Sequence, residues 1–154
     1  MSSPIVFDTG AIIELLNKSD TRIAVQIEEF LKDKPHSPRV IYEPNLVELF
    51  YLLVKKHKLL CPSDIKINLD HFAIEIYPVP ENYTNKIHEG YFSLNYKAVF
   101  DYADFFMCAA ALRYGKSTIL TVDRDDLPNA LSTAMKIFAS SGESTAQLIP
   151  FKVK

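Results

Sequence analysis

Short apolar runs of strand length alternate in this chain with longer stretches that have the apolar spacing of a helix. This alternation constrains the fold more than any other feature of the sequence. The runs that predict strands are Pro4–Phe7, Val40–Tyr42, Phe72–Pro78 and Ser117–Thr121. Strands that alternate with helical patterns of about 10–15 residues imply βαβ units and a parallel sheet. We therefore expect a three-layer α/β/α fold, with a central parallel sheet and helices on both of its faces.

The predicted helices are bounded by cap residues, prolines and glycines. They cover Ala11–Leu16, Thr21–Lys32, Pro44 to the lysines at 55–58, Ser63–Leu69, Glu81–Leu94 and Asp101–Tyr114. Asp8–Gly10 is predicted as a turn, Ser63 as a helix cap and Gly115 as the residue that ends the last helix. Beyond Asp123 the pattern weakens, and Met135–Phe138 and Gln147–Val153 are predicted as edge strands.

Length and composition indicate one ordinary globular domain, which we expect to span residues 1–154. The chain has 17 Lys and Arg against 19 Asp and Glu, which argues against an arginine-rich arm or a polybasic lipid-binding segment. No apolar run approaches the roughly 20 residues of a membrane helix. Cys61 and Cys108 form no CxxC motif, and Met1–Pro4 does not begin a secretory signal. We expect a soluble cytoplasmic protein with two reduced thiols.

Four carboxylates are placed where a parallel sheet binds ligands. Asp8 and Asp123 each follow a predicted strand, and ligands bind beyond the carboxyl ends of parallel strands. Glu48 and Asp104 lie in otherwise apolar helical stretches. A doubly wound fold brings all four elements to one edge of the sheet. Four carboxylates this close repel one another unless a divalent cation lies between them.

Each of these acidic residues also has a purely structural interpretation. Asp8 and Asp123 are in positions where Asp commonly caps the next helix. Asp101 and Asp104 would complement the dipole of their helix, and Glu48 would be a solvated position on an amphipathic helix. It is the set of four, rather than any single residue, that indicates a site.

Four segments around these carboxylates carry a resemblance to a known family. They are Ile5–Ala11 with Asp8 and Thr9, Pro44–Leu49 with Glu48, Asp104–Leu112, and Leu120–Asp125 with Asp123. In this order they resemble the four acidic motifs of PIN-domain ribonucleases, and most closely those of the VapC-type toxins of bacterial and archaeal toxin–antitoxin pairs. In the third motif an Asp precedes apolar and small residues that end in Leu eight positions later, as Asp104 and Leu112 do.

The resemblance implies a single PIN domain and a Mg²⁺- or Mn²⁺-dependent endoribonuclease, the toxin of a type II toxin–antitoxin pair. It implies that four carboxylates are catalytic and bind the metal: Asp8, Glu48, Asp104 and Asp123. Thr9 and Thr121 would support them. Carboxylate oxygens are the hard ligands that Mg²⁺ and Mn²⁺ prefer. A bound cation lowers the pKa of a water and neutralises charge on the scissile phosphate.

The resemblance also implies partners: an RNA substrate, single-stranded or in a structured loop, a second copy of the chain in a homodimer, and an antitoxin protein. The four proposed ligands leave 15 acidic residues against 17 basic ones, so the remaining surface is slightly basic. The basic residues that are candidates for RNA contacts, or alternatively for solvated positions, are Arg39, Lys55, Lys56, Lys58, Arg113, Lys116 and Arg124.

Several alternatives stay open at this stage. The chain could be a catalytically inactive PIN module that binds RNA or protein, or an RNA-processing PIN nuclease outside toxin–antitoxin systems. Any of Asp101, Asp125 and Asp126 could join the site. We expect Phe105 and Phe106 in the core, whereas Tyr91, Phe92 and Tyr96 fit either the core or a partner surface.

Other motif matches in the sequence are weak. Asp8–Gly10 also spells the aspartic-protease signature, but that fold is all-β and here the motif enters a helical pattern. Gly115–Ser117 lacks the earlier glycine of a P-loop and has the order of helix and strand reversed. A haloacid-dehalogenase phosphatase needs a second Asp at position 10. The four histidines lack metal-ligand spacing and are expected at the surface.

Overall fold

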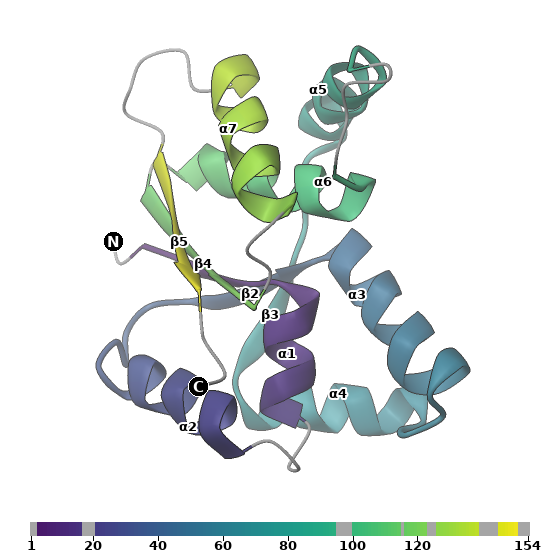
Figure 1. Ribbon diagram of the computed structural model, residues 1–154, viewed down its shortest axis with the longest axis vertical. Coiled ribbons are helices and arrows are strands. Elements are labelled where there is room, and N and C mark those ends of the chain that lie inside the picture. Colours follow the sequence, from purple (N-terminus) through teal and green to yellow (C-terminus); the bar gives the residue numbers. More distant parts are fainter. Residues whose placement is uncertain are drawn as a thin grey trace.

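Figure 1 shows a computed structural model of the chain, in which a five-stranded parallel sheet runs through the centre. The structure describes residues 3–16, 21–94, 100–114, 116–122, 126–138 and, for the backbone alone, 145–150. The strands are β1 (Ile5–Phe7), β2 (Arg39–Tyr42), β3 (Ile74–Tyr77), β4 (Lys116–Thr121) and β5 (Thr145–Pro150). Their order is β3-β2-β1-β4-β5, and every pairing is parallel.

Helices cover both faces of this sheet (Figure 1). Along the chain they are α1 (Thr9–Leu16), α2 (Thr21–Lys32), α3 (Glu43–Phe50), the π-helix η1 (Tyr51–Lys56), α4 (Pro62–His71), α5 (Glu81–Phe92), α6 (Tyr102–Ala111), the 3₁₀ turn η3 (Leu112–Tyr114) and α7 (Asp126–Phe138). The three-layer α/β/α arrangement predicted from the sequence is therefore confirmed.

Two hydrophobic clusters fill the space between the layers. Val6 and Ile119 pack on one face with residues of α5, α6 and α7. Ile5, Phe7 and Leu120 pack on the other face with residues of α1, α2, α3, η1 and α4. Neighbouring residues of one strand fall in different clusters because successive side chains point to opposite faces of a sheet.

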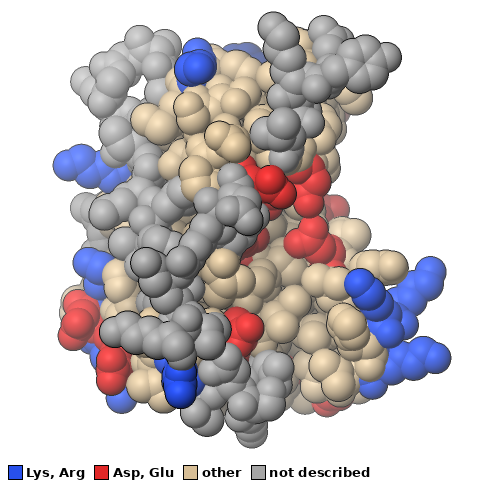
Figure 2. All heavy atoms as spheres, viewed as in Figure 1, with Lys and Arg blue, Asp and Glu red and all other residues tan. Residues whose placement is uncertain are grey.

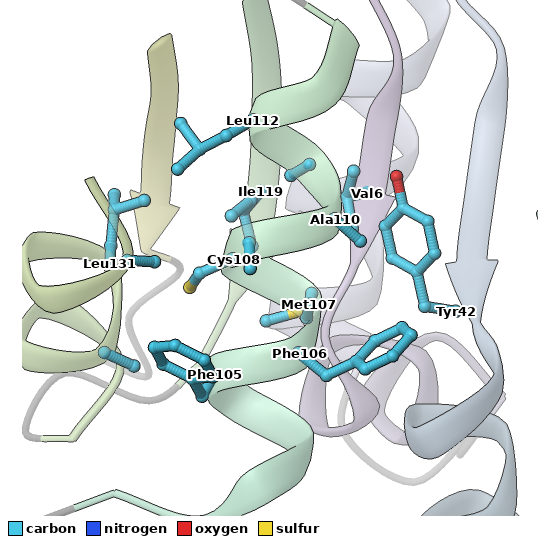
Figure 3. Packing of buried hydrophobic residues seen from close by; sticks show 14 of the residues in the cluster. Val6, Tyr42, Phe105, Phe106, Met107, Cys108, Ala110, Leu112, Ile119 and Leu131 are labelled. Atoms are coloured by element: carbon cyan, nitrogen blue, oxygen red, sulfur yellow. The ribbon is translucent and has the colours of Figure 1, made fainter. Parts of the chain in front are cut away.

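Helix α6 is the most deeply buried helix of the first cluster, and every residue from Phe105 to Ala111 is buried. Figure 3 shows Met107 and Cys108 inside this layer and the ring of Phe106 beside that of Tyr42. The centroids of those two rings are 6.3 Å apart in an edge-to-face arrangement. The expectation that Phe105 and Phe106 belong to the core is confirmed.

Two predictions about the ends of elements were wrong. Asp8–Gly10 is not a separate turn, because Asp8 leads directly into α1, which begins at Thr9. Ser63 does not cap α4: Cys61 is the N-cap, and it forms a capping box with Asp64. The predicted helix from Pro44 to the lysines is confirmed as a continuous helical segment: it is an α-helix to Phe50 and continues as the π-helix η1, which ends at Lys56.

The C-terminal region holds a larger error. Met135–Phe138 was predicted as an edge strand but forms the last turn of α7. Leu127, Ala130, Leu131 and Ala134 recur at helical spacing and bury one side of this helix. Gln147–Val153 overlaps β5, the edge strand beside β4, up to Pro150. Gly115 and residues 151–153 lie outside the described residues.

No helix in the described part of the chain has the length and apolar character needed to cross a membrane.

Candidate active site

The site lies where the direction of the sheet's connections reverses. From β1 the chain moves outward to β2 and β3, and then returns past β1 to β4 and β5. Neighbouring strands β1 and β4 are therefore followed by connections that leave in opposite directions, which opens a crevice at their carboxyl ends. Asp8 follows the last residue of β1, and Thr121 is the last residue of β4.

Asp8 is fixed in this crevice by two hydrogen bonds. Its Oδ1 accepts from the backbone N–H of Thr9, and its Oδ2 accepts from the hydroxyl of Thr121, both at 2.8 Å. Its own backbone N–H donates to the carbonyl of Leu120 at 3.0 Å, which joins the ends of the two strands. Asp8 as a whole residue is 5% exposed. Because these donors are neutral groups, they orient the carboxylate without cancelling its charge.

Glu48 enters the same region from α3. Burial raises the pKa of the Glu48 carboxyl, a hydrogen bond with the Thr9 side chain lowers it, and the charge of Asp101 raises it further. Thr9 therefore connects two of the proposed ligands, since its backbone holds Asp8 and its hydroxyl contacts Glu48. A carboxyl whose ionisation is opposed by burial and by a second carboxylate is stabilised in its charged form by a cation.

Helix α6 contributes Asp101 and Asp104. Asp101 is the N-cap, and its Oδ1 accepts from the backbone N–H of Asp104 at 2.9 Å. Asp104 is half-buried in the first turn. Burial raises the pKa of the Cys108 thiol, and the charges of Asp104 and Asp8 raise it further. The carboxylates of Asp104 and Asp8 therefore both lie near the Cys108 side chain, and this places the start of α6 close to the end of β1.

The structure thus brings Asp8, Glu48 and Asp104 to one edge of the sheet from three different elements. Figure 2 shows acidic side chains gathered in the hollow between α6 and α3. Asp123 and Asp125 lie outside the described residues, and Asp126 is exposed at the start of α7. Asp101 serves as a helix cap, and its charge also acts on Glu48.

Among the described residues alone, no group of three or more His, Cys, Asp or Glu side chains has the geometry of a complete metal site. The donors present nevertheless fit a hard divalent cation, because they are carboxylate oxygens and the ionisation of Glu48 is opposed by its surroundings. The fourth proposed ligand, Asp123, is not among the residues searched.

Sequence reasoning missed Asn45, which is fully buried beneath the site. Its Nδ2 donates to the hydroxyl of Thr9 at 3.1 Å, and its Oδ1 has no hydrogen-bond partner among the described residues. It lies three residues before Glu48, so both are on the same side of α3. The three-residue spacing from Glu48 is the signal that could have pointed to Asn45. The residue type gives none, because an Asn near the start of a helix is ordinarily at the surface.

The basic candidates have different surroundings. Arg39 donates to the carbonyl of Phe72 at 2.8 Å, and Arg113 lies over the rings of Tyr83 and Tyr114, so both have structural contacts. Lys55, Lys56, Lys58 and Lys116 are exposed. Lys55 and Lys56 end η1 and Lys58 follows two residues later, in the region where Lys and Arg atoms project at the lower right of Figure 2. Arg124 lies outside the described residues.

Three histidines are exposed as expected, but His88 is half-buried and its Nε2 lies 2.7 Å from the Tyr102 hydroxyl. Tyr91 is also half-buried, and it packs against Tyr102 and Phe105. Phe92 is 78% exposed. Of the aromatic residues left open by the sequence, Tyr91 therefore belongs to the core, Phe92 is at the surface and Tyr96 lies outside the described residues.

The fold is that of an α/β protein, and its sheet carries carboxylates from several elements at the switch point. The family model described as PIN domain matches residues 5–130, and the chain belongs to the PIN domain family. Members of this family are generally metal-dependent nucleases, and therefore hydrolases. Comparison with curated proteins and with solved structures finds no match.

Proposed function

We propose that this chain is a Mg²⁺- or Mn²⁺-dependent endoribonuclease formed by a single PIN domain over residues 1–154. The observation that carries the proposal is the buried Asp8 carboxylate, held at the switch point by Thr9 and Thr121. In this proposal four carboxylates hold the cation and are catalytic: Asp8, Glu48, Asp104 and Asp123. When bound, the cation would activate a water and neutralise charge on the scissile phosphate.

The residues around the carboxylates have a positioning role. The Thr9 amide and the Thr121 hydroxyl hold both oxygens of Asp8, and Asn45 holds the Thr9 hydroxyl that contacts Glu48. Three of these contacts are buried, so the ligands are oriented before metal and substrate arrive. Without a cation, the negative charge of the site would repel an RNA phosphate.

We further propose that the substrate is single-stranded or looped RNA in the cytoplasm, and that the chain is the toxin of a type II pair. The exposed lysines at the end of η1 supply sequence-independent attraction for a phosphate backbone. The exposed ring of Phe92 is the apolar side chain we assign to contact with a second copy in a homodimer or with an antitoxin protein.

Thermal unfolding with and without Mn²⁺ tests the metal site without knowledge of the RNA target. A cation at 100 times its Kd adds about 2.7 kcal/mol to the free energy of unfolding. In Asp8→Asn the amide oxygen still accepts from the Thr9 N–H, and the amide nitrogen can donate to the Thr121 hydroxyl. This variant should therefore fold but lose both the Mn²⁺ shift and Mn²⁺-dependent cleavage of single-stranded RNA.

The matched control is Asp33→Asn, which removes an exposed carboxylate from the segment after α2 and should keep the full Mn²⁺ shift and activity. A wild-type protein that shows no Mn²⁺ shift would contradict the metal site. Metal binding without cleavage of any RNA in a mixed-sequence library would instead favour the inactive binding module.

A further inference from the structure

A pocket opens beside the proposed metal site, and none of the three proposed ligands that the structure describes, Asp8, Glu48 and Asp104, lines it. Its volume is about 590 Å³, within the range of roughly 300–1,000 Å³ that is usual for small-molecule sites. Its walls come from the start of α3, the exposed edge strand β3 with the segment after it, the middle of α5 and the start of α6.

The pocket shares two helices with the proposed site. Val47 of α3 lines it, and the next residue is Glu48; Ala103 of α6 lines it, and the next residue is Asp104. Consecutive Cα atoms are 3.8 Å apart, so the pocket wall begins one residue from two proposed ligands. The pocket and two proposed ligands therefore lie on neighbouring faces of the same two helices, and we infer that a base next to the scissile phosphate is within reach of the pocket.

The lining combines aromatic and apolar surface with a few polar groups. Tyr77, Tyr102 and Phe106 contribute rings, and the Tyr102 hydroxyl lies 2.7 Å from Nε2 of the half-buried His88. The charged side chain of Glu43 is at the rim, and among the described residues that line the pocket there is neither Lys nor Arg. This lining is unfavourable for a phosphate and suited to a flat, uncharged group that donates hydrogen bonds.

We propose that the pocket binds one nucleobase of the RNA next to the scissile phosphate, and that it prefers bases with an exocyclic amino group. This inference rests on the proposed ribonuclease function. The rings supply a stacking surface, as aromatic side chains do for single-stranded nucleic acids. The Glu43 carboxylate accepts from the amino edge of cytosine, adenine or guanine, which uracil lacks.

The polar groups favour a base over an apolar side chain of a partner protein. An apolar side chain in this pocket would cover the Glu43 carboxylate without offering it a hydrogen bond, which is costly. A base offers donors and acceptors on its edge together with two flat faces.

Free nucleosides test the pocket separately from the metal site, because they carry no phosphate and need no cation. Cytidine, adenosine, guanosine and uridine are titrated at millimolar concentration into the protein in EDTA, and binding is followed by saturation-transfer NMR. We expect uridine to bind about tenfold or more weakly than the others. Glu43→Gln should reduce this difference, whereas Glu29→Gln, on the exposed face of α2, should keep it.

Tyr102→Phe keeps the ring and removes the hydroxyl next to His88, and it should weaken all four nucleosides. No nucleoside binding, or equal binding of uridine and cytidine, would overturn the proposal. Binding of an apolar fluorescent dye that no nucleoside displaces would overturn it in favour of a protein-docking surface. Nucleoside binding in a protein without a Mn²⁺ thermal shift would keep the base pocket and contradict the proposed nuclease function.

Discussion

The hydroxyl of Thr121 donates a hydrogen bond of 2.8 Å to Oδ2 of Asp8, and the two residues are 113 positions apart in the sequence. Both side chains are buried, and each lies at the carboxyl end of its strand. Parallel pairing of β1 with β4, in which Phe7 lies beside Leu120, brings these ends together. One hydrogen bond therefore links the correct register of the sheet to the orientation of a proposed metal ligand.

Removing this donor should lower both stability and metal affinity. Thr121→Val keeps the shape of the side chain but withdraws the hydrogen bond from a charged, buried acceptor. Hydrogen bonds to charged groups contribute about 1.5–3 kcal/mol, and we expect the free energy of unfolding to fall by this amount. Urea unfolding measures the loss, and the Mn²⁺ thermal shift should shrink because Asp8 loses the hydrogen bond that orients its Oδ2.

Thr118→Val is the matched control, since Thr118 lies on the same strand and is half-buried. It should change the free energy of unfolding by less than about 0.5 kcal/mol. Equal effects of the two substitutions would show that the Thr121 hydroxyl has no particular relation to Asp8.

A close approach of two segments should make Gly10 intolerant of a larger side chain. A Cβ atom added at Gly10 would lie 2.6 Å from Cγ2 of Val122, far inside van der Waals contact. Gly10→Ala would ordinarily favour the helix, but here we expect a loss of about 1–3 kcal/mol from overpacking. Val122→Ala removes the clashing methyl group, so the double variant should recover most of the loss in a double-mutant cycle. Additive effects would contradict the clash.

The sequence predicted the sheet well because its four best-defined strands are short apolar runs bounded by polar or proline residues. All four appear in the structure, each within two residues of its expected ends. The last helix was missed because Met135–Phe138, viewed alone, fits a strand as well as a helix turn. Its helical spacing becomes clear only when the buried Leu127 and Leu131 are included.

Only some of the site residues could be predicted from the sequence. Asp8 could be singled out because it follows a predicted strand, and Glu48 and Asp104 because each is a carboxylate in an apolar helical stretch. The structure places all three at one edge of the sheet. Asn45 and His88 could not be found this way. Their positions depend on contacts with Thr9 and Tyr102, and no local pattern in the sequence encodes such tertiary contacts.

The raised pKa of Glu48 predicts how the metal-free protein responds to pH. The folded state binds the Glu48 proton more tightly than the unfolded state does. The stabilisation of the folded state by this bound proton is therefore complete below the pKa of Glu48 in the unfolded chain. It is lost as the pH rises through the folded pKa of Glu48. In EDTA, Glu48→Gln should therefore raise the melting temperature at neutral pH, and its advantage should shrink as the pH falls towards the usual range of Glu.

Glu29→Gln, in an exposed position of α2, is the control and should leave the melting temperature unchanged at every pH. Addition of Mn²⁺ should reverse the order at neutral pH, because the wild type then gains stability from metal binding that Glu48→Gln has lost. A Glu48→Gln protein that is less stable than wild type in EDTA would contradict the electrostatic cost assigned to this carboxylate.

Tyr42 offers a stabilising substitution away from the proposed ligands. The side chain is fully buried, and its hydroxyl has no hydrogen-bond partner among the described residues. Burial raises the pKa of this phenol, so it stays protonated and keeps a polar O–H group within the core. Tyr42→Phe removes that group and preserves the ring that packs against Phe106 (Figure 3). Since an unsatisfied buried polar group costs about 1–3 kcal/mol, urea unfolding should show a gain in the free energy of unfolding of up to this amount.

The control is Tyr42→Leu, which removes the ring as well and should lower the free energy of unfolding. A loss of stability in Tyr42→Phe would show that the hydroxyl has a hydrogen-bond partner in solution.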